Sequence, residues 1–295
     1  MESLTFKVAD IYFSIEAASA DELKRLLPSY APFFVGRHTD HKLALEAIVD
    51  NNLVSDQPEG EELGQFDCGG CNHGIYKIAD GYKLLISTEE GNLASALKTN
   101  SDFSKCSISL LGEEKDHPFG LGNALMIAFA FAASYHNILL MHASVTMQGG
   151  YGYLFLGKSG TGKSTHSSLW RKYIPGSDLL NDDNPAVRFT NEGEAIVYGT
   201  PWSGKTPCYR NLQLPIGAFV RLEQFPENVI RKESPIQSFA SILSSCSTMV
   251  WDKPSYDHIA HTTEQIVAHV PAFYLQCRAD EEAAQLSYQT IAHKA

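Results

Sequence analysis

The feature that most constrains this chain is a glycine-rich loop at residues 157–164, GKSGTGKS, which matches the pattern GxxxxGK[ST]. Glycines let such a loop turn back tightly and leave backbone N–H groups free to face phosphate oxygens. The apolar run before it, 151–156, predicts a strand, and residues 164–173 predict a helix whose positive end would face an anion. A strand, this loop and a helix in that order indicate a nucleoside triphosphate site.

Each position of the loop has an expected task. Lys163 would give a positive charge to the β- and γ-phosphates, and the hydroxyl of Ser164 would be a ligand of Mg²⁺. We therefore expect ATP and Mg²⁺ as cofactors. The residues expected to bind them are Gly157, Ser159, Gly160, Thr161, Gly162, Lys163, Ser164 and Thr165.

The same pattern occurs a second time at residues 199–206, GTPWSGKT. Here Pro201 removes a backbone N–H that a phosphate cradle needs, and Trp202 is bulky where the backbone should approach a phosphate. Prolines at 207 and 215 leave no room for a long helix after it. We therefore do not expect a second phosphate loop, although Lys205 and Arg210 are cations that could act in this segment.

Two carboxylates, Asp182 and Asp183, follow the apolar pair at 179–180. One carboxylate near a phosphate loop can hold Mg²⁺, and Asp183 is our first choice for that ligand beside Ser164. A second carboxylate can accept the proton of an attacking hydroxyl, so both are candidate catalytic residues. The alternative is a polar turn, because Asp-Asp-Asn-Pro is good turn chemistry.

His142 lies in an otherwise apolar run, 139–145, that predicts a strand. A lone histidine in such a strand is most often a core residue whose hydrogen bonds are satisfied. From the residues alone, a structural role is therefore the leading interpretation of His142.

Composition limits the partners. The 295 residues carry a formal net charge of -11, without a run of Lys and Arg, so nucleic acid and anionic membrane surfaces are not expected partners. The N-terminus lacks the pattern of a signal peptide, and the apolar stretch at 121–141 reads as a buried helix, which favours a cytoplasmic protein. Cys68 and Cys71 form a lone CxxC, interpreted as a hairpin turn, with metal or redox chemistry as the alternative.

The patterning changes along the chain and predicts two domains. Residues 1–115 form a strand-rich N-terminal domain, with strands expected at 6–17, 33–35, 74–78, 82–87 and 106–111 and a helix at 20–27 that begins after Ser19. Residues 116–295 form a nucleotide-binding domain of mixed α/β class. Its expected helices are 123–136, 164–173, 235–249, 262–269 and 280–291, and its expected strands are 139–147, 152–156, 195–198, 216–222 and 272–277.

Three motifs in this order resemble the phosphoenolpyruvate carboxykinase superfamily: Met141-His142-Ala143-Ser144, then 155–165, then Asn181-Asp182-Asp183. Within it, the size and the Asp-Asp-Asn run look like the catalytic domain of HPr kinase/phosphorylase and its relatives. The resemblance covers about residues 120–290 and implies a carboxykinase-like P-loop fold. The first 115 residues do not look like the N-terminal domain of HPr kinase; they look more like the leader domain of HPr-kinase-like proteins.

The resemblance also implies residue roles. In HPr kinases a histidine before the phosphate loop pairs with an aspartate that serves as base toward a protein serine, and His142 and Asp183 or Asp182 match those positions. In the carboxykinases the equivalent histidine helps to bind a metal. Arg210 matches an arginine that stabilises the transferring phosphoryl group, and Lys205 is a second candidate for that task.

These features lead to the expectation of a Mg-ATP-dependent kinase that phosphorylates a serine-type hydroxyl of a protein, a peptide or a small metabolite. This chain lacks a convincing copy of the downstream signature region of HPr kinases, which counts against HPr itself and against the reverse reaction. The alternatives are a non-catalytic nucleotide-binding regulator, and a phosphorylase or phosphatase acting through the same site. Related kinases form rings, so a homo-oligomer is an open option.

Overall fold

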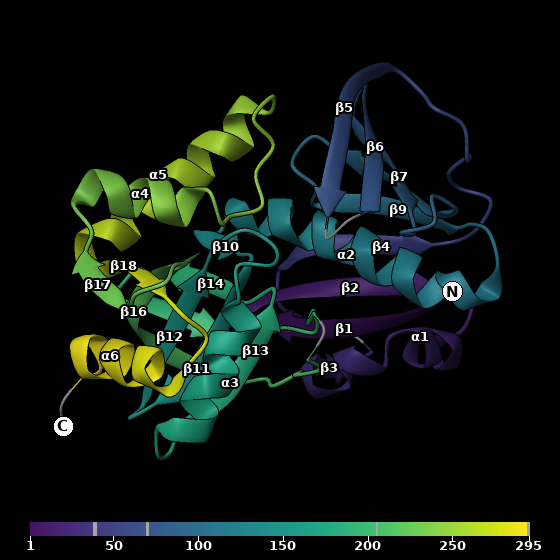
Figure 1. Cartoon of the computed structure of the whole chain (residues 1–295). Helices are drawn as coiled ribbons and strands as arrows, with labels where there is room; N and C mark the ends of the chain where they lie inside the picture. Colours follow the sequence, from purple (N-terminus) through teal and green to yellow (C-terminus); the bar gives the residue numbers. More distant parts are fainter. Residues whose placement is uncertain (38–39, 69–70, 205, 294–295) are drawn as a thin grey trace. The chain divides into compact units, whose positions relative to one another are not determined.

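The structure, a computed structural model, describes residues 1–37, 40–68, 71–204 and 206–293, and among these all side chains except those of 65–72 (Figure 1). The chain divides into two compact units, Met1–His136 and Asn137–Ala295. Each unit contains its own nine-stranded sheet among the described residues, and helices pack against both sheets. The fold is therefore of the mixed α/β class, as the sequence predicts.

The first unit is strand-rich. Its sheet has the order β3-β1-β2-β4-β9-β8-β7-β6-β5. In chain order its elements are β1 (Glu2–Val8), β2 (Ile11–Ala17), α1 (Ala20–Leu26), η1 (Pro28–Phe33), β3 (Phe34–Gly36), β4 (Leu43–Val49), β5 (Glu61–Cys68), β6 (Cys71–Ile78), β7 (Gly81–Ser87), β8 (Leu93–Asn100), β9 (Lys105–Leu110), η2 (Glu114–Asp116) and α2 (His117–Ser134).

Helix α2 belongs to the first unit. It packs against β4, β8 and β9, and its Phe129 ring lies 5.7 Å from that of Phe13 in β2. The sequence places this helix in the second domain, after residue 115, whereas the compact units meet after His136. The difference arises because the apolar surface of α2 is buried on the first sheet, a long-range contact that periodicity does not reveal.

Local signals account for several elements of this unit. Ser19 caps α1, since its Oγ accepts a hydrogen bond from the N–H of Glu22 at 3.3 Å, as expected. The expected hairpin of 74–78 and 82–87 is present as β6 and β7. The single strand expected at 6–17 is wrong: Ala9 and Asp10, with φ of 49° and 61°, turn the chain into the β1–β2 hairpin. Cys68 stands opposite Cys71 in the β5–β6 hairpin, and the turn between them lies outside the described residues.

The second unit contains β10 (Ile138–Leu140), β11 (Ala143–Gln148), β12 (Tyr151–Leu156), α3 (Lys163–Tyr173), β13 (Asp178–Asp183), β14 (Ala186–Phe189), β15 (Ala195–Tyr198), β16 (Gln213–Gln224), β17 (Val229–Lys232), α4 (Pro235–Leu243), α5 (Lys253–His269), β18 (Ala272–Cys277) and α6 (Glu281–Ile291). Its sheet has the order β10-β14-β15-β16-β12-β11-β13, and β18 pairs with both β16 and β17.

The second unit has three layers, because helices cover both faces of its sheet and a buried core lies on each face. On one face of the sheet, Leu154 and Phe219 are buried with Ile242 of α4 and with residues of α5. On the other face, Phe155 and Val220 are buried with side chains of α3 and α6. Successive residues of one strand therefore enter different cores, as the period of two along a strand requires.

Some expected boundaries in this unit are wrong. The helix expected at 235–249 ends at Leu243, and the helix expected at 262–269 begins at Lys253. The strand expected at 139–147 is divided into β10 and β11, with Met141 and His142 between them. None of the helices in the described part of the chain combines the length and the apolarity that a membrane crossing needs.

Candidate functional site

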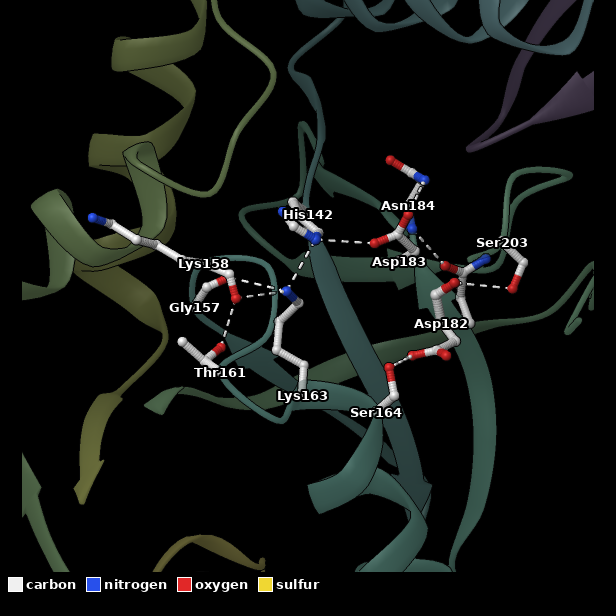
Figure 2. Close-up of polar contacts among 11 residues, drawn as sticks. His142, Gly157, Lys158, Thr161, Lys163, Ser164, Asp182, Asp183, Asn184 and Ser203 are labelled. Atoms are coloured by element: carbon white, nitrogen blue, oxygen red, sulfur yellow. Dashed lines mark hydrogen bonds and ion pairs between the residues drawn. The ribbon is translucent and has the colours of Figure 1, made fainter. Parts of the chain in front are cut away.

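Three strands of the second unit bring the sequence motifs to one edge of the sheet. Ala143, the first residue of β11, pairs with Leu156, the last residue of β12, and with Asp183, the last residue of β13. His142, the glycine-rich loop and the acid pair consequently meet there, although they are separated in sequence (Figure 2). The antiparallel pairing of β11 with both neighbours produces this convergence.

The loop between β12 and α3 has the backbone that a phosphate cradle requires. Gly157 has a φ of 147°, and a Cβ there would lie 2.5 Å from Oγ1 of Thr161, so this position excludes a side chain. Gly162, with a φ of 101°, leads directly into α3 at Lys163. Around Gly160 and Gly162 a Cβ would meet no atom within 4 Å, so the space beside this helix end is open. An anion can approach the positive end of α3 there.

Lys163 is buried at 7% exposure and is held on the loop itself. Its Nζ donates to the carbonyl oxygens of Gly157 at 3.0 Å and Lys158 at 3.4 Å, and lies 2.9 Å from Nε2 of His142. Burial lowers the pKa of Lys163 from its usual range, and the charges of Asp183 and Asp182 oppose that shift. The ammonium group therefore occupies a site made of carbonyl dipoles and one imidazole (Figure 2).

His142 faces both Lys163 and Asp183. Its Nε2 lies 2.9 Å from Nζ of Lys163 and 3.0 Å from Oδ1 of Asp183. A ring nitrogen carries either a lone pair or a hydrogen, so Nε2 can accept from Lys163 or donate to Asp183, but not both at once. The backbone N–H of His142 donates to the carbonyl of Ser245 at 2.7 Å, which holds the backbone at the break between β10 and β11.

Asp182 and Asp183 point to different partners. Asp182 is 2% exposed, and its Oδ1 accepts from the Ser164 hydroxyl at 2.9 Å. Its buried Oδ2 has no hydrogen-bond partner among the described residues. Asp183 is about a third exposed, and its Oδ2 accepts from the side-chain amide of Asn184 at 3.0 Å while Oδ1 meets His142. The polar turn that the sequence left as the alternative is not formed at these two residues, which are the end of strand β13.

The buried, unpaired Oδ2 of Asp182 is the observation that bears on whether a divalent cation fits beside Ser164. A buried carboxylate oxygen without a donor is costly, and a cation is one way to satisfy it. In the described part of the chain no three His, Cys, Asp or Glu side chains gather around a metal position. Mg²⁺ does not need such a cage, since one or two carboxylates with substrate phosphates and water commonly hold it. Ser164 and Asp182 provide this kind of partial site.

The other candidates are placed elsewhere. Arg210 forms an ion pair with Asp178, Nη2 to Oδ2 at 2.6 Å, and Asp178 begins β13 while Asp183 ends it. Those ends are about 16 Å apart at the usual rise of a strand, so Arg210 is not brought to the His142 cluster. Lys205 lies outside the described residues. Ser159 and Thr165 are exposed on the loop and on the first turn of α3.

Helix α3 is fixed at its far side by α6. The indole N–H of Trp170 donates to Oγ of Ser287 at 2.8 Å, and Nε2 of His166 lies 3.0 Å from the same oxygen. Both rings also contact Phe155 of β12. Burial lowers the pKa of His166 to about 4, so this histidine is neutral at physiological pH. The helix that carries Lys163 and Ser164 is thereby held on a rigid support.

The segment at 199–206 is not followed by a helix; the next element is β16 at Gln213. It lies instead against the end of β13, where Thr200 and Trp202 contact Asn181. The sequence interpretation did not include Asn181 or Thr200 among the site residues. Asn181 stood only as the first residue of the Asn-Asp-Asp motif, and its role depends on contact partners that the sequence does not reveal.

No family model matches the sequence. No curated protein matches it either. Among solved structures, the HPr(Ser) kinase/phosphatase from Coxiella burnetii aligns with 51% of this chain and 95% of its own, at 15% identity and a TM-score of 0.32.

Proposed function

We propose that the second unit is a Mg-ATP-dependent phosphotransferase that delivers the γ-phosphate of ATP to a serine-type hydroxyl of a protein, a peptide or a small molecule. One observation carries this proposal. A buried phosphate-loop lysine, a histidine and a carboxylate form one chain of contacts, Lys163–His142–Asp183, beside a second carboxylate bonded to the loop serine. Nucleotide binding requires the loop, and proton removal from an acceptor requires the partly exposed carboxylate.

The geometry supports different roles for the two carboxylates. Asp182 is buried, contacts Ser164 and has an unpaired oxygen, so it fits the metal site with Ser164. Asp183 is exposed enough to meet an acceptor, and His142 can hold its Oδ1. We therefore assign the metal to Asp182 rather than to Asp183, and the base role to Asp183. When bound, Mg²⁺ would neutralise charge on the phosphates.

The proposed transfer is a single displacement. The acceptor oxygen forms a bond to the γ-phosphorus while the bond between that phosphorus and the β–γ bridging oxygen breaks, which releases ADP. The proton of the acceptor hydroxyl passes to the carboxylate of Asp183. Donation from Nε2–H of His142 to Oδ1 of Asp183 would orient that carboxylate, and the backbone N–H groups of the loop would hold the phosphates.

Lys163 has to move for this to occur. Its ammonium group is satisfied by Gly157, Lys158 and His142. Phosphate oxygens would be stronger partners for an ammonium group than carbonyl oxygens, because charged pairs form stronger hydrogen bonds. Movement of Lys163 to the phosphates would leave Nε2 of His142 with Asp183 as its remaining partner.

The test is transfer of label from [γ-³²P]ATP, with Mg²⁺, into components of a lysate or of a set of serine-containing acceptors. The wild-type protein is expected to label an acceptor, and Asp183→Asn is expected to bind ATP while labelling at least about 100-fold more slowly. ATP binding without turnover for every acceptor would favour the non-catalytic regulator. Release of phosphate from a phosphoserine acceptor by water would favour the phosphatase, and transfer of that phosphoryl group to free phosphate, with release of pyrophosphate, would favour the phosphorylase. Equal labelling by wild type and Asp183→Asn would refute the assigned base.

A further inference from the structure

The second match to the phosphate-loop pattern, 199–206, lies against the end of β13 and not between a strand and a helix. Its Thr200 is fully buried, and the hydroxyl donates to the carbonyl oxygen of Asn184 at 2.6 Å. Its Trp202 is also buried, with its indole away from solvent. The segment therefore contacts Asn184, the residue that follows the acid pair.

Asn181 connects this segment to β13. It is fully buried, and its Nδ2 donates to Oγ1 of Thr200 at 3.2 Å and to the carbonyl of Trp202 at 3.1 Å. Its Oδ1 accepts from the backbone N–H of Asn184 at 3.0 Å. Both sides of one side-chain amide are thus used, and they join the backbone just after Asp183 to the segment that contains Thr200 and Trp202.

Asp183 needs such support. Its φ is 111°, a conformation that is unfavourable for a residue with a side chain and that persists where surrounding contacts fix it. Ser203 pairs with Asp183, and the N–H of Gly204 donates to the carbonyl of Asp182 at 2.6 Å. A Cβ at Gly204 would lie 2.9 Å from Cβ of Asp183, so a glycine is required for this approach.

We propose that Asn181 and Thr200 are positioning residues, which hold the strained backbone of Asp183 so that its carboxylate meets Nε2 of His142. The catalytic role of the contact between His142 and Asp183 rests on the proposed phosphotransfer. The contact itself is present in the structure whether or not that reaction occurs. The segment at 199–204 packs against the end of β13 and supports its backbone, and Gly204 leaves space for the side chain of Asp183. Neither positioning residue touches the nucleotide loop in the contacts above, so both act on the base and not on nucleotide affinity.

A purely structural role makes a different prediction. If the network only stabilised the fold, its loss would lower the yield of folded protein and leave folded molecules with normal kinetics. If it positions Asp183, folded molecules should bind ATP normally, with a reduced kcat and a changed environment at the His142 ring. A displacement of about 1 Å in a reacting group can cost about 100-fold in rate.

The experiment uses the full chain and three variants. Thr200→Val keeps the shape and removes the hydroxyl, Thr200→Ser keeps the hydroxyl, and Thr262→Val is the matched control. Thr262 is also buried, in α5, and its hydroxyl donates to the carbonyl of His258 in the same helix at 2.9 Å. Thr200→Val should lower kcat by about 10- to 100-fold at unchanged ATP affinity. Thr200→Ser should recover to within about threefold of wild type, and Thr262→Val should not change kcat.

A second measurement does not depend on activity. The ¹⁵N resonances of the His142 ring, assigned with His142→Gln, report its contact with Asp183 at fixed pH. In Thr200→Val they should shift toward those of Asp183→Asn, and in Thr200→Ser they should stay at the wild-type positions. Unchanged His142 resonances in folded Thr200→Val would overturn the positioning role. Shifted resonances in a protein without transfer activity would support it while refuting the proposed phosphotransfer.

Discussion

At the scale of single residues, two adjacent carboxylates have different surroundings and therefore different proposed roles. Successive residues of a strand point to opposite faces, so Asp182 and Asp183 separate although they are neighbours in sequence. Asp182 enters the buried side next to Ser164, and Asp183 faces His142 with about a third of its side chain exposed. The sequence could identify the pair but not this division, because the division depends on the register of β13 against β11.

The division predicts different defects in the two neutral variants. Asp182→Asn should raise the Mg²⁺ concentration for half-maximal activity by at least about tenfold, equivalent to about 1.4 kcal/mol. Asp183→Asn should leave that concentration unchanged and lower kcat, by about 10²- to 10⁴-fold, through loss of the base. The measurement is a Mg²⁺ titration of activity at saturating ATP.

Asp178→Asn is the control, because Asp178 lies on the same strand but pairs with Arg210 at the other end. Its Mg²⁺ dependence should equal that of wild type. The proposed roles are wrong if Asp183→Asn, and not Asp182→Asn, shifts the Mg²⁺ dependence.

At the scale of elements, α3 carries two loop residues of the site, and its attachment to α6 should make the second unit sensitive to acid. His166 has a pKa lowered by burial to about 4, from 6.5 in an unfolded chain. Between these values the unfolded chain binds a proton that the folded chain does not, so stability is complete above pH 6.5 and falls as the pH falls toward 4. Below about pH 4 this contribution no longer changes.

The expected loss between pH 7 and pH 5 is about 2 kcal/mol for wild type. His166→Gln should remove most of this loss, although it can lower stability at both pH values. The measurement is denaturant unfolding followed at both pH values. His261→Gln, at an exposed site of α5, is the control and should keep the wild-type difference. A pH dependence unchanged by His166→Gln would show that α3 has no such sensitivity.

Several elements were predictable because their signals are local. The strand–loop–helix order at 151–173, the Ser19 cap and the strands at 195–198 and 272–277 follow from residue types within a few positions. Strands β4 and β8 were not predicted, since their pairing with β9 depends on distant residues. The break at Met141 and His142 was also missed. It is fixed by long-range contacts, the N–H of Met141 to Pro185 and that of His142 to Ser245, which no local pattern reveals.

At the scale of the whole molecule, all described site residues come from the second unit, Asn137–Ala295. Mg-ATP should therefore slow hydrogen exchange in the peptides that contain the loop, His142 and the acid pair. Peptides of the β6–β7–β8 region of the first unit should exchange at the same rate with and without nucleotide. Hydrogen-exchange mass spectrometry gives this comparison directly, and Lys163→Ala, which should bind nucleotide poorly, is the control for effects of the nucleotide in solution.

Protection confined to the first unit would place the nucleotide elsewhere and would contradict the assignment of the site.

The domain boundary illustrates why whole-molecule organisation was harder to predict than the loop. Helix α2 is apolar around most of its surface, so its sequence does not indicate which sheet it covers. Only its packing on β4, β8 and β9 assigns it to the first unit.

The most direct test of the central claim is a calorimetric titration of the full-length protein with ATP, in the presence and absence of Mg²⁺, for wild type and Lys163→Ala. We expect saturable binding of one ATP per chain that is strengthened by Mg²⁺. We also expect at least about tenfold weaker binding in Lys163→Ala, which corresponds to about 1.4 kcal/mol. Absence of saturable binding to the wild-type chain, or an affinity unaffected by Lys163→Ala, would contradict the proposed nucleotide site.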